Sequence, residues 1–214
     1  MSACGIDLLV VDDHMIIRRG LVQILSENAA IGDIREAHDG ASALRAVRER
    51  APRVMLLDIA LGERDGLDVL KNVRAEFPAV GVVMLSVYPE SQFAVRAIRA
   101  GAGAYLNKGC SPDELFGAIE RVAAGGVYVT PSIAELLARS VRSDEARAPH
   151  ESLSNREFQV LELLARGHSV SDIAAQLSLS GNTISTYRAR IFDKLGVRSI
   201  VELLHYANRH DLLG

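Results

Sequence analysis

The sequence predicts an α/β domain followed by an all-α domain. Up to about residue 123, short apolar runs alternate with segments of helical period, whereas from Leu153 onward the period is helical throughout. The length of 214 residues suits two domains. Apolar residues make up 49% of the chain and Trp is absent, so both cores should be aliphatic.

The apolar runs are predicted β-strands, and three of them are continuously apolar, as parallel strands covered on both faces require. The runs are Ile6–Val11, Ile34–Ala37, Val54–Leu57, Val80–Leu85 and Ala104–Leu106. The helical segments that follow them are Met15–Ser26, Ala41–Arg50, Leu67–Phe77, Ser91–Ala100 and Pro112–Ala123. Five βα units in series predict a doubly wound (βα)5 sheet, whose site lies at the carboxyl ends of the strands.

Residues 1–125 form the predicted first domain, residues 126–150 a linker and residues 151–214 the second domain. The linker contains a possible helix over Ser132–Val141 and ends in a polar stretch. The second domain contains four short helices. Ser154 and Glu157 are spaced as a capping box, and Ser180 and Gly196 bound the third helix.

Acidic, hydroxyl and ammonium groups stand at four of the five strand ends. They are Asp12, Asp13, Asp58, Ser86 and Lys108. Taken singly, each of these residues is as readily explained as an ordinary turn or surface residue as it is by a role in a site. Together they would meet at one edge of the sheet, where three carboxylates need a cation and oxygen-only ligands favour Mg²⁺. A hydroxyl and an ammonium beside them suit phosphoryl transfer to a nucleophilic Asp.

The motifs "VDDH", "LLDI", "DGLDVL", "MLS" and "NKG" make residues 1–125 resemble a response-regulator receiver domain of flavodoxin-like fold. The resemblance implies that Asp58 is the phosphoacceptor and that Ser86 and Lys108 bind the phosphoryl oxygens. It implies Mg²⁺ ligands at Asp12, Asp13, Asp58 and the backbone carbonyl of Ala60, a switch at Ser86 and Tyr105, and a loop-shaping role for His14. We expect Asp13 to bind the ion directly and Asp12 to act through the cluster or a water molecule.

The rival enzyme class is a phosphatase of the haloacid-dehalogenase type, which also uses a nucleophilic Asp. That chemistry needs a second Asp two residues after the first, as general acid. The chain has Ala60 at that position, which disfavours this class.

The third helix of the second domain has an apolar stripe, and its other faces are polar. Its spacing alone fits an amphipathic helix with a solvated face as well as a DNA-recognition helix. The pieces "LSNRE", "VLELLARG", "DIA", "NTIS" and "KLGVRS" resemble a LuxR-type DNA-binding domain over residues 151–210. The implied DNA-contacting residues are Asn182, Thr183, Ser185, Thr186, Arg188, Arg190 and Lys194. Because Ser185 stands where many relatives carry Lys, we expect Arg188 and Arg190 to carry more of the binding.

Together the two domains resemble the NarL/FixJ class of two-component response regulators. The resemblance implies a sensor histidine kinase as phosphoryl donor, double-stranded promoter DNA as ligand, and a homodimer on activation, with Ser199–His210 as a candidate contact. It implies no enzymatic activity beyond phosphorylation and dephosphorylation of its own Asp. The alternative is a regulator whose receiver is a protein-interaction platform and whose DNA binding is independent of phosphate.

The remaining features predict a cytoplasmic protein that does not interact with membranes. Cys4 and Cys110 form no disulfide framework or metal-ligand pattern, no signal peptide is visible, and no apolar run approaches the roughly 18 residues of a membrane span.

Overall fold

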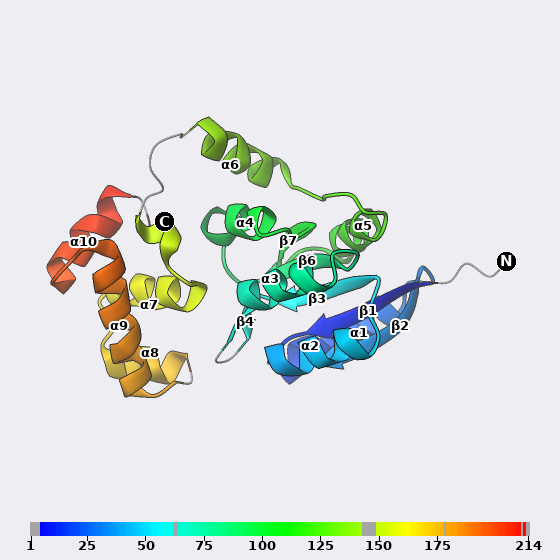
Figure 1. Cartoon of the computed structure of the whole chain (residues 1–214), viewed down its shortest axis with the longest axis horizontal. Helices are drawn as coiled ribbons and strands as arrows, with labels where there is room; N and C mark the ends of the chain where they lie inside the picture. Colours follow the sequence, from blue (N-terminus) through cyan, green and yellow to red (C-terminus); the bar gives the residue numbers. More distant parts are fainter. Residues whose placement is uncertain (1–4, 62–63, 143–148, 178, 211, 213–214) are drawn as a thin grey trace. The chain divides into compact units, whose positions relative to one another are not determined.

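The chain forms two compact units, Met1–Ser143 and Asp144–Gly214. The computed structural model describes residues 5–61, 64–142, 149–177, 179–210 and 212. Figure 1 shows the helices and strands of both units.

The first unit is built on a five-stranded parallel sheet of order β2-β1-β3-β6-β7, which confirms the doubly wound arrangement (Figure 1). The strands are β1 (Ile6–Val11), β2 (Ile31–Ala37), β3 (Val54–Asp58), β6 (Gly81–Ser86) and β7 (Ala104–Asn107). Every residue of β3 is buried, which explains its continuously apolar sequence. The edge strand β2 begins three residues before the predicted Ile34. Its polar Asp33 is tolerated there because this edge is exposed.

Five helices cover the two faces of this sheet. They are α1 (Met15–Ser26), α2 (Gly40–Glu49), α3 (Gly66–Glu76), α4 (Glu90–Arg99) and α5 (Pro112–Ala123). Side chains of α1 and α5 share a core with Leu8, Val10 and Leu56. The next residues along the strands, such as Leu9 and Met55, point to the opposite face. There α2 and α3 pack against each other and against β1 and β3.

Residues 126–142 pack on the first unit, although the sequence analysis set residues 126–150 apart as a linker. Tyr128 forms a parallel bridge with Ala104 of β7, and α6 (Pro131–Arg142) packs on α4. The hydroxyl of Thr130 donates to Glu90, at 2.9 Å from Oε1 and 3.0 Å from Oε2, and Ile133 is fully buried. The polar stretch that the sequence predicts as flexible lies, over 143–148, outside the described residues.

A two-stranded antiparallel sheet follows β3 and was not predicted. It pairs β4 (Ala60–Leu61) with β5 (Arg64–Asp65), and Ala60 lies opposite Asp65. Strands of two residues are too short to show an alternating pattern in sequence. This sheet directly adjoins Asp58, so it shapes the loop at the carboxyl end of β3.

The second unit has the expected helices: α7 (Asn155–Ala165), α8 (Val170–Gln176), α9 (Gly181–Leu195) and α10 (Ile200–Arg209), preceded by the 3₁₀ turn η1 (Pro149–Ser152). Each α-helix begins after a serine whose hydroxyl accepts a backbone N–H three residues later. The four caps are Ser154, Ser169, Ser180 and Ser199. Gly196 ends α9 with a left-handed φ of 67°. Ser178, between α8 and α9, lies outside the described residues.

Gly66 allows α3 to start directly against the carboxyl end of β3. A Cβ at Gly66 would lie 2.2 Å from the carbonyl oxygen of Asp58 and 2.9 Å from Cα of Ile59, both backbone atoms. We expect Gly66→Ala to lower the free energy of unfolding by roughly 1–3 kcal/mol through overpacking, measured by urea unfolding followed by circular dichroism. Gly20→Ala is the matched control. Its Cβ would meet nothing within 4 Å in α1, and Ala should stabilise by about 0.5–1 kcal/mol. Equal effects of the two substitutions would contradict this account.

Candidate functional site

The carboxyl ends of β1, β3 and β7 bring Asp12, Asp58 and Lys108 into contact. Asp12 is 1% exposed and Asp58 2% exposed. The Nζ atom of Lys108 lies 2.7 Å from Oδ2 of Asp12 and 2.8 Å from Oδ2 of Asp58. Among the described residues these two oxygens have no hydrogen-bond partner beyond this ion pair. The structure therefore joins residues 12, 58 and 108 as strand order predicted.

This cluster changes the proton affinity of its members. Burial raises the pKa of Asp58 to about 6, and Asp12 acts in the same direction, while Lys108 and the Ala60 N–H act against it. Burial disfavours the ammonium of Lys108, yet the carboxylates of Asp58 and Asp12 outweigh burial and raise the pKa of Lys108. One ammonium faces two carboxylates, so the cluster is negative when both acids are ionised, and a further cation would stabilise it.

Asp13 and His14 form the outer edge of the cluster. The ring atom Nδ1 of His14 lies 2.7 Å from Oδ1 of Asp13. The backbone N–H of His14 donates to Oδ1 of Asp12 at 2.8 Å. One donor atom from each of Asp12, Asp13, His14 and Asp58 lies within 4.8 Å of the others. This acidic donor set is compatible with Mg²⁺, which prefers oxygen ligands. A ring nitrogen of His14 is one of these four atoms, although the sequence did not predict His14 as a metal ligand.

Ala60 contacts the carboxylate of Asp58 through its backbone. Its backbone N–H donates to Oδ1 of Asp58 at 3.2 Å. This bond orients one oxygen of the carboxylate, while Lys108 holds the other.

Ser86 and Tyr105 are linked through Tyr88. Ser86 is fully buried at the end of β6, directly after Leu85, which pairs with Asp58. Its Oγ accepts the Tyr88 N–H at 2.9 Å, and the Tyr105 hydroxyl donates to the Tyr88 carbonyl at 3.2 Å. Tyr105 is fully buried, and burial raises the pKa of its phenol. Its side chain lies inside the first unit.

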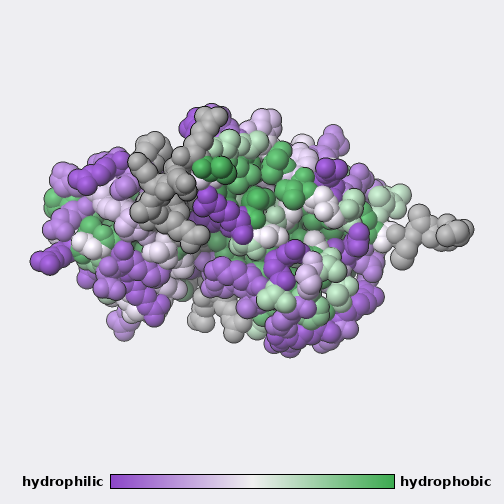
Figure 2. Space-filling model, turned by 45° about the horizontal axis from the view of Figure 1, so that its top comes forward, coloured by the Kyte–Doolittle hydropathy of each residue, from purple (hydrophilic) through white to green (hydrophobic). Residues whose placement is uncertain are grey.

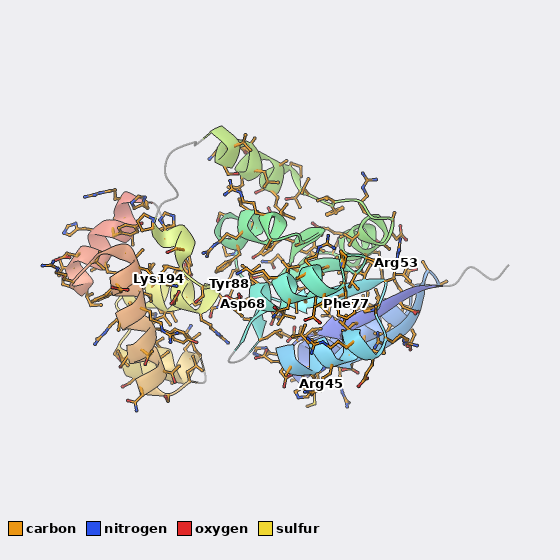
Figure 3. The ribbon with its side chains drawn as sticks, in the orientation of Figure 1. Arg45, Arg53, Asp68, Phe77, Tyr88 and Lys194 are labelled. Atoms are coloured by element: carbon orange, nitrogen blue, oxygen red, sulfur yellow. The ribbon has the colours of Figure 1, made fainter. Side chains whose placement is uncertain are left out.

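Tyr88 was missed in the sequence analysis, although it stands two residues after Ser86. Its ring packs edge-on against Phe93 of α4, with ring centroids 5.4 Å apart. Figure 3 marks Tyr88, which lies between β6 and α4 in the chain. The residue therefore joins the buried hydroxyl of Ser86 to the packing of α4.

In the second unit, α9 buries its apolar stripe and exposes its polar face. Ile184 and Ile191 are fully buried and Leu195 is 7% exposed. The candidate DNA-contacting residues that are exposed on α9 are Asn182, Ser185, Thr186, Arg188, Arg190 and Lys194. The face of the second unit visible in Figure 2 is mainly hydrophilic.

The side chains of three candidate residues have partners within the second unit. The hydroxyl of Thr186 donates to the Asn182 carbonyl at 3.0 Å. Nζ of Lys194 lies 2.6 Å from Oε2 of Glu157, which is buried in α7 (Figure 3). Lys194 also donates to the Ser152 carbonyl at 3.3 Å. The hydroxyl of Thr183 lies 2.8 Å from that of the capping Ser180. Lys194 thus pairs with a buried acid, which spacing along α9 alone does not reveal.

Comparisons with known proteins agree with both halves of the chain. The family model "Response regulator receiver domain" matches residues 8–120, and "Bacterial regulatory proteins, luxR family" matches residues 151–207. The chain belongs to the response regulators. It combines a receiver with a LuxR-type helix-turn-helix domain, which is the architecture of a phosphorylation-controlled, DNA-binding regulator of transcription rather than of a phosphatase.

Similar proteins extend over nearly the whole length of this response regulator. It is 36% identical over 208 residues to response regulator UvrY of Escherichia coli strain K12, covering 97% of this chain and 95% of UvrY. It is 37% identical over 209 residues to response regulator GacA of Pseudomonas aeruginosa, covering 97% and 98%. The structure of RcsB from Salmonella enterica serovar Typhimurium bound to promoter rprA matches with a TM-score of 0.60 at 22% identity. That match covers 94% of this chain and 98% of RcsB and shows the shared fold.

The helices of the described residues are all too short or too polar to cross a membrane.

The raised pKa of Asp58 predicts how stability depends on pH. Its carboxyl is protonated below about pH 6 in the folded state but only below about pH 3.8 in the unfolded chain. The buried carboxylate therefore lowers stability above pH 6, and this cost disappears as the pH falls toward 4. At pH 8 with EDTA, we expect Asp58→Asn to raise the free energy of unfolding by roughly 1–3 kcal/mol, because a tenfold change in proton affinity equals about 1.4 kcal/mol.

Urea unfolding of wild type and Asp58→Asn across pH 4 to 8 measures this difference. The gap should be widest at pH 8 and vanish near pH 4. A gap that widens toward acid would contradict the assignment of the buried charge to Asp58.

Proposed function

We propose that this response regulator accepts a phosphoryl group on Asp58 from a phosphohistidine of a sensor histidine kinase. The phosphorylated protein then binds double-stranded promoter DNA through α9. The observation that carries the proposal is the buried carboxylate of Asp58, held by Lys108 beside Asp12. Because the promoter is in the cytoplasm, we place this activity there.

In the proposed reaction a carboxylate oxygen of Asp58 attacks phosphorus, and the bond from phosphorus to the donor breaks. The product is an acyl phosphate, and the donor leaves with the bonding electron pair. With a pKa of about 6, Asp58 is largely ionised near neutral pH and thus able to act as nucleophile. The ammonium of Lys108, 2.8 Å from Asp58, would pair with the transferred phosphoryl oxygens.

Mg²⁺ fits beside this carboxylate, and Asp12, Asp13, Asp58 and the carbonyl of Ala60 would hold it. When bound, it would neutralise the negative charge of the acids and of the transferred group. The same site would return the acyl phosphate to Asp and inorganic phosphate by attack of water, as the only catalysis of the protein.

Ser86 and Tyr105 would report the phosphate to α4. A phosphoryl oxygen offers a strong acceptor for the Ser86 hydroxyl, and Ser86 Oγ now accepts the Tyr88 N–H. A shift of Ser86 would therefore alter Tyr88, whose carbonyl holds Tyr105 and whose ring packs on Phe93. Moving such a switch from 1:99 to 99:1 requires about 5.5 kcal/mol of differential stabilisation.

On DNA, α9 would lie in the major groove and the protein would act as a homodimer formed on activation. Two-fold paired half-sites are commonly bound by protein dimers, and α10 is the candidate contact between copies. The exposed Asn182, Ser185, Thr186, Arg188 and Arg190 would face bases and phosphates. The side chains of Lys194, Thr183 and Thr186 would contribute less, since all three have partners in their own unit.

Asp58→Asn should abolish phosphate uptake from acetyl phosphate and MgCl₂, because the amide of Asn is not a nucleophile of this kind. Intact-mass spectrometry of the full chain measures the added phosphate. Asp68→Asn is the matched control, since Asp68 is an exposed residue of α3 that pairs with Lys71 (Figure 3), and it should be phosphorylated like the wild type.

Equal phosphate uptake by Asp58→Asn and wild type would refute the assignment of the acceptor.

The same samples, examined by sedimentation velocity, should show the mass of a dimer only for phosphorylated protein. DNA binding that is equally strong without phosphate would favour the interaction-platform alternative.

Arg190→Ala should weaken binding to a DNA duplex that the wild type selects from a random-sequence pool. The loss of one base or phosphate contact is expected to cost about 1–3 kcal/mol, or roughly 5- to 150-fold in affinity. Fluorescence anisotropy at fixed salt measures it. Arg166→Ala, at the end of α7 and paired with Glu162, removes the same charge elsewhere and should leave affinity unchanged. Unaltered circular dichroism together with unaltered affinity of Arg190→Ala would show that Arg190 does not contact DNA.

A further inference from the structure

Arg18 of α1 contacts the loop that carries the acidic residues. Its Nη1 donates to the backbone carbonyl of Asp12 at 2.7 Å. Its Nε donates to Oε2 of Glu36 on β2 at 2.8 Å. The Arg18 side chain is only 14% exposed, and α1 packs against β2. One guanidinium therefore joins α1, β2 and the end of β1.

The carbonyl of Asp12 belongs to the peptide that leads into Asp13. A charge-assisted hydrogen bond to this carbonyl restricts rotation of the peptide plane. That plane sets the direction in which the Asp13 side chain leaves the loop. The next peptide carries the backbone N–H of His14, which donates to Oδ1 of Asp12 at 2.8 Å and closes the loop over that carboxylate.

Glu36 gives Arg18 its orientation and compensates its charge. A bare guanidinium near a divalent cation would repel it, and the carboxylate at 2.8 Å offsets that effect. The planar guanidinium reaches the carbonyl and the carboxylate at the same time, through two different nitrogen atoms. A lysine ammonium is a point charge and cannot reproduce this geometry.

We propose that Arg18, oriented by Glu36, is a positioning residue that holds Asp12 and Asp13 in the arrangement that binds the divalent cation. Arg18 touches neither the ion nor the phosphoryl group, and it acts through the Asp12 carbonyl. The inference rests on the proposed metal-dependent phosphorylation and adds a determinant of metal affinity to it.

The test is titration of full-length protein with MgCl₂ alone, followed by isothermal calorimetry. Removing a group that orients metal ligands typically lowers metal affinity about 10–100-fold, and we expect this loss for Arg18→Gln. Arg18→Lys should recover part of the affinity, and Glu36→Gln should lower it less than Arg18→Gln. Arg19→Gln is the matched control, because Arg19 is the exposed neighbour on α1, and it should bind Mg²⁺ like the wild type.

A second readout separates positioning from general damage. The rate of phosphorylation from acetyl phosphate should fall for Arg18→Gln at limiting Mg²⁺ and recover at saturating Mg²⁺. If circular dichroism shows that Arg18→Gln does not fold, the Mg²⁺ affinity and the phosphorylation rates at limiting and saturating Mg²⁺ are compared between Glu36→Gln and the wild type instead. Wild-type Mg²⁺ affinity in Arg18→Gln, or a rate that saturating Mg²⁺ does not restore, would overturn the inference alone. No Mg²⁺ binding by the wild type would instead overturn the proposed function.

Discussion

The first unit depends on a buried arrangement of charge in which the ammonium of Lys108 lies between the carboxylates of Asp12 and Asp58. Two carboxylates and one ammonium at the end of a parallel sheet are costly unless another positive group completes the balance. Burial raises the pKa of Asp58, and Asp12 acts in the same direction. The excess negative charge of the two carboxylates also favours a divalent cation. The same buried carboxylates therefore lower the stability of the fold when no cation is bound and would serve as ligands when a cation is present.

The surrounding structure orients these charges through backbone contacts as much as through side chains. The Ala60 N–H holds one oxygen of Asp58, and the Asp12 carbonyl is held by Arg18. On the other side, Tyr88 connects the buried hydroxyl of Ser86 to α4, and Thr130 ties α4 to α6 through Glu90. Contacts therefore run from Ser86 through Tyr88 and α4 to α6 within the first unit.

The second unit is organised by its helix ends. A serine caps each of its four described α-helices. At α7 the carboxylate of Glu157 completes a capping box by accepting the backbone N–H of Ser154 at 2.7 Å. Glu157 also accepts from Lys194 of α9, and these contacts hold its pKa below the usual range although burial acts against them. The residue that completes the cap of α7 therefore also contacts α9, while Arg188 and Arg190 of α9 are exposed.

The sequence by itself determined the five strands of the parallel sheet, the helices that follow them and those of the second unit, the serine caps at Ser154 and Ser180, and the convergence of Asp12, Asp58 and Lys108. These features follow from local periodicity, from hydrogen bonds within three residues, and from the rule that parallel strands end at one edge. Only the tertiary structure decided the partners that lie far apart in sequence: Lys194 with Glu157, Arg18 with Glu36, and α6 with α4. The physical reason is that a long charged side chain looks the same in sequence whether it faces solvent or a buried partner. Which of these it does depends on packing between elements that no local pattern encodes.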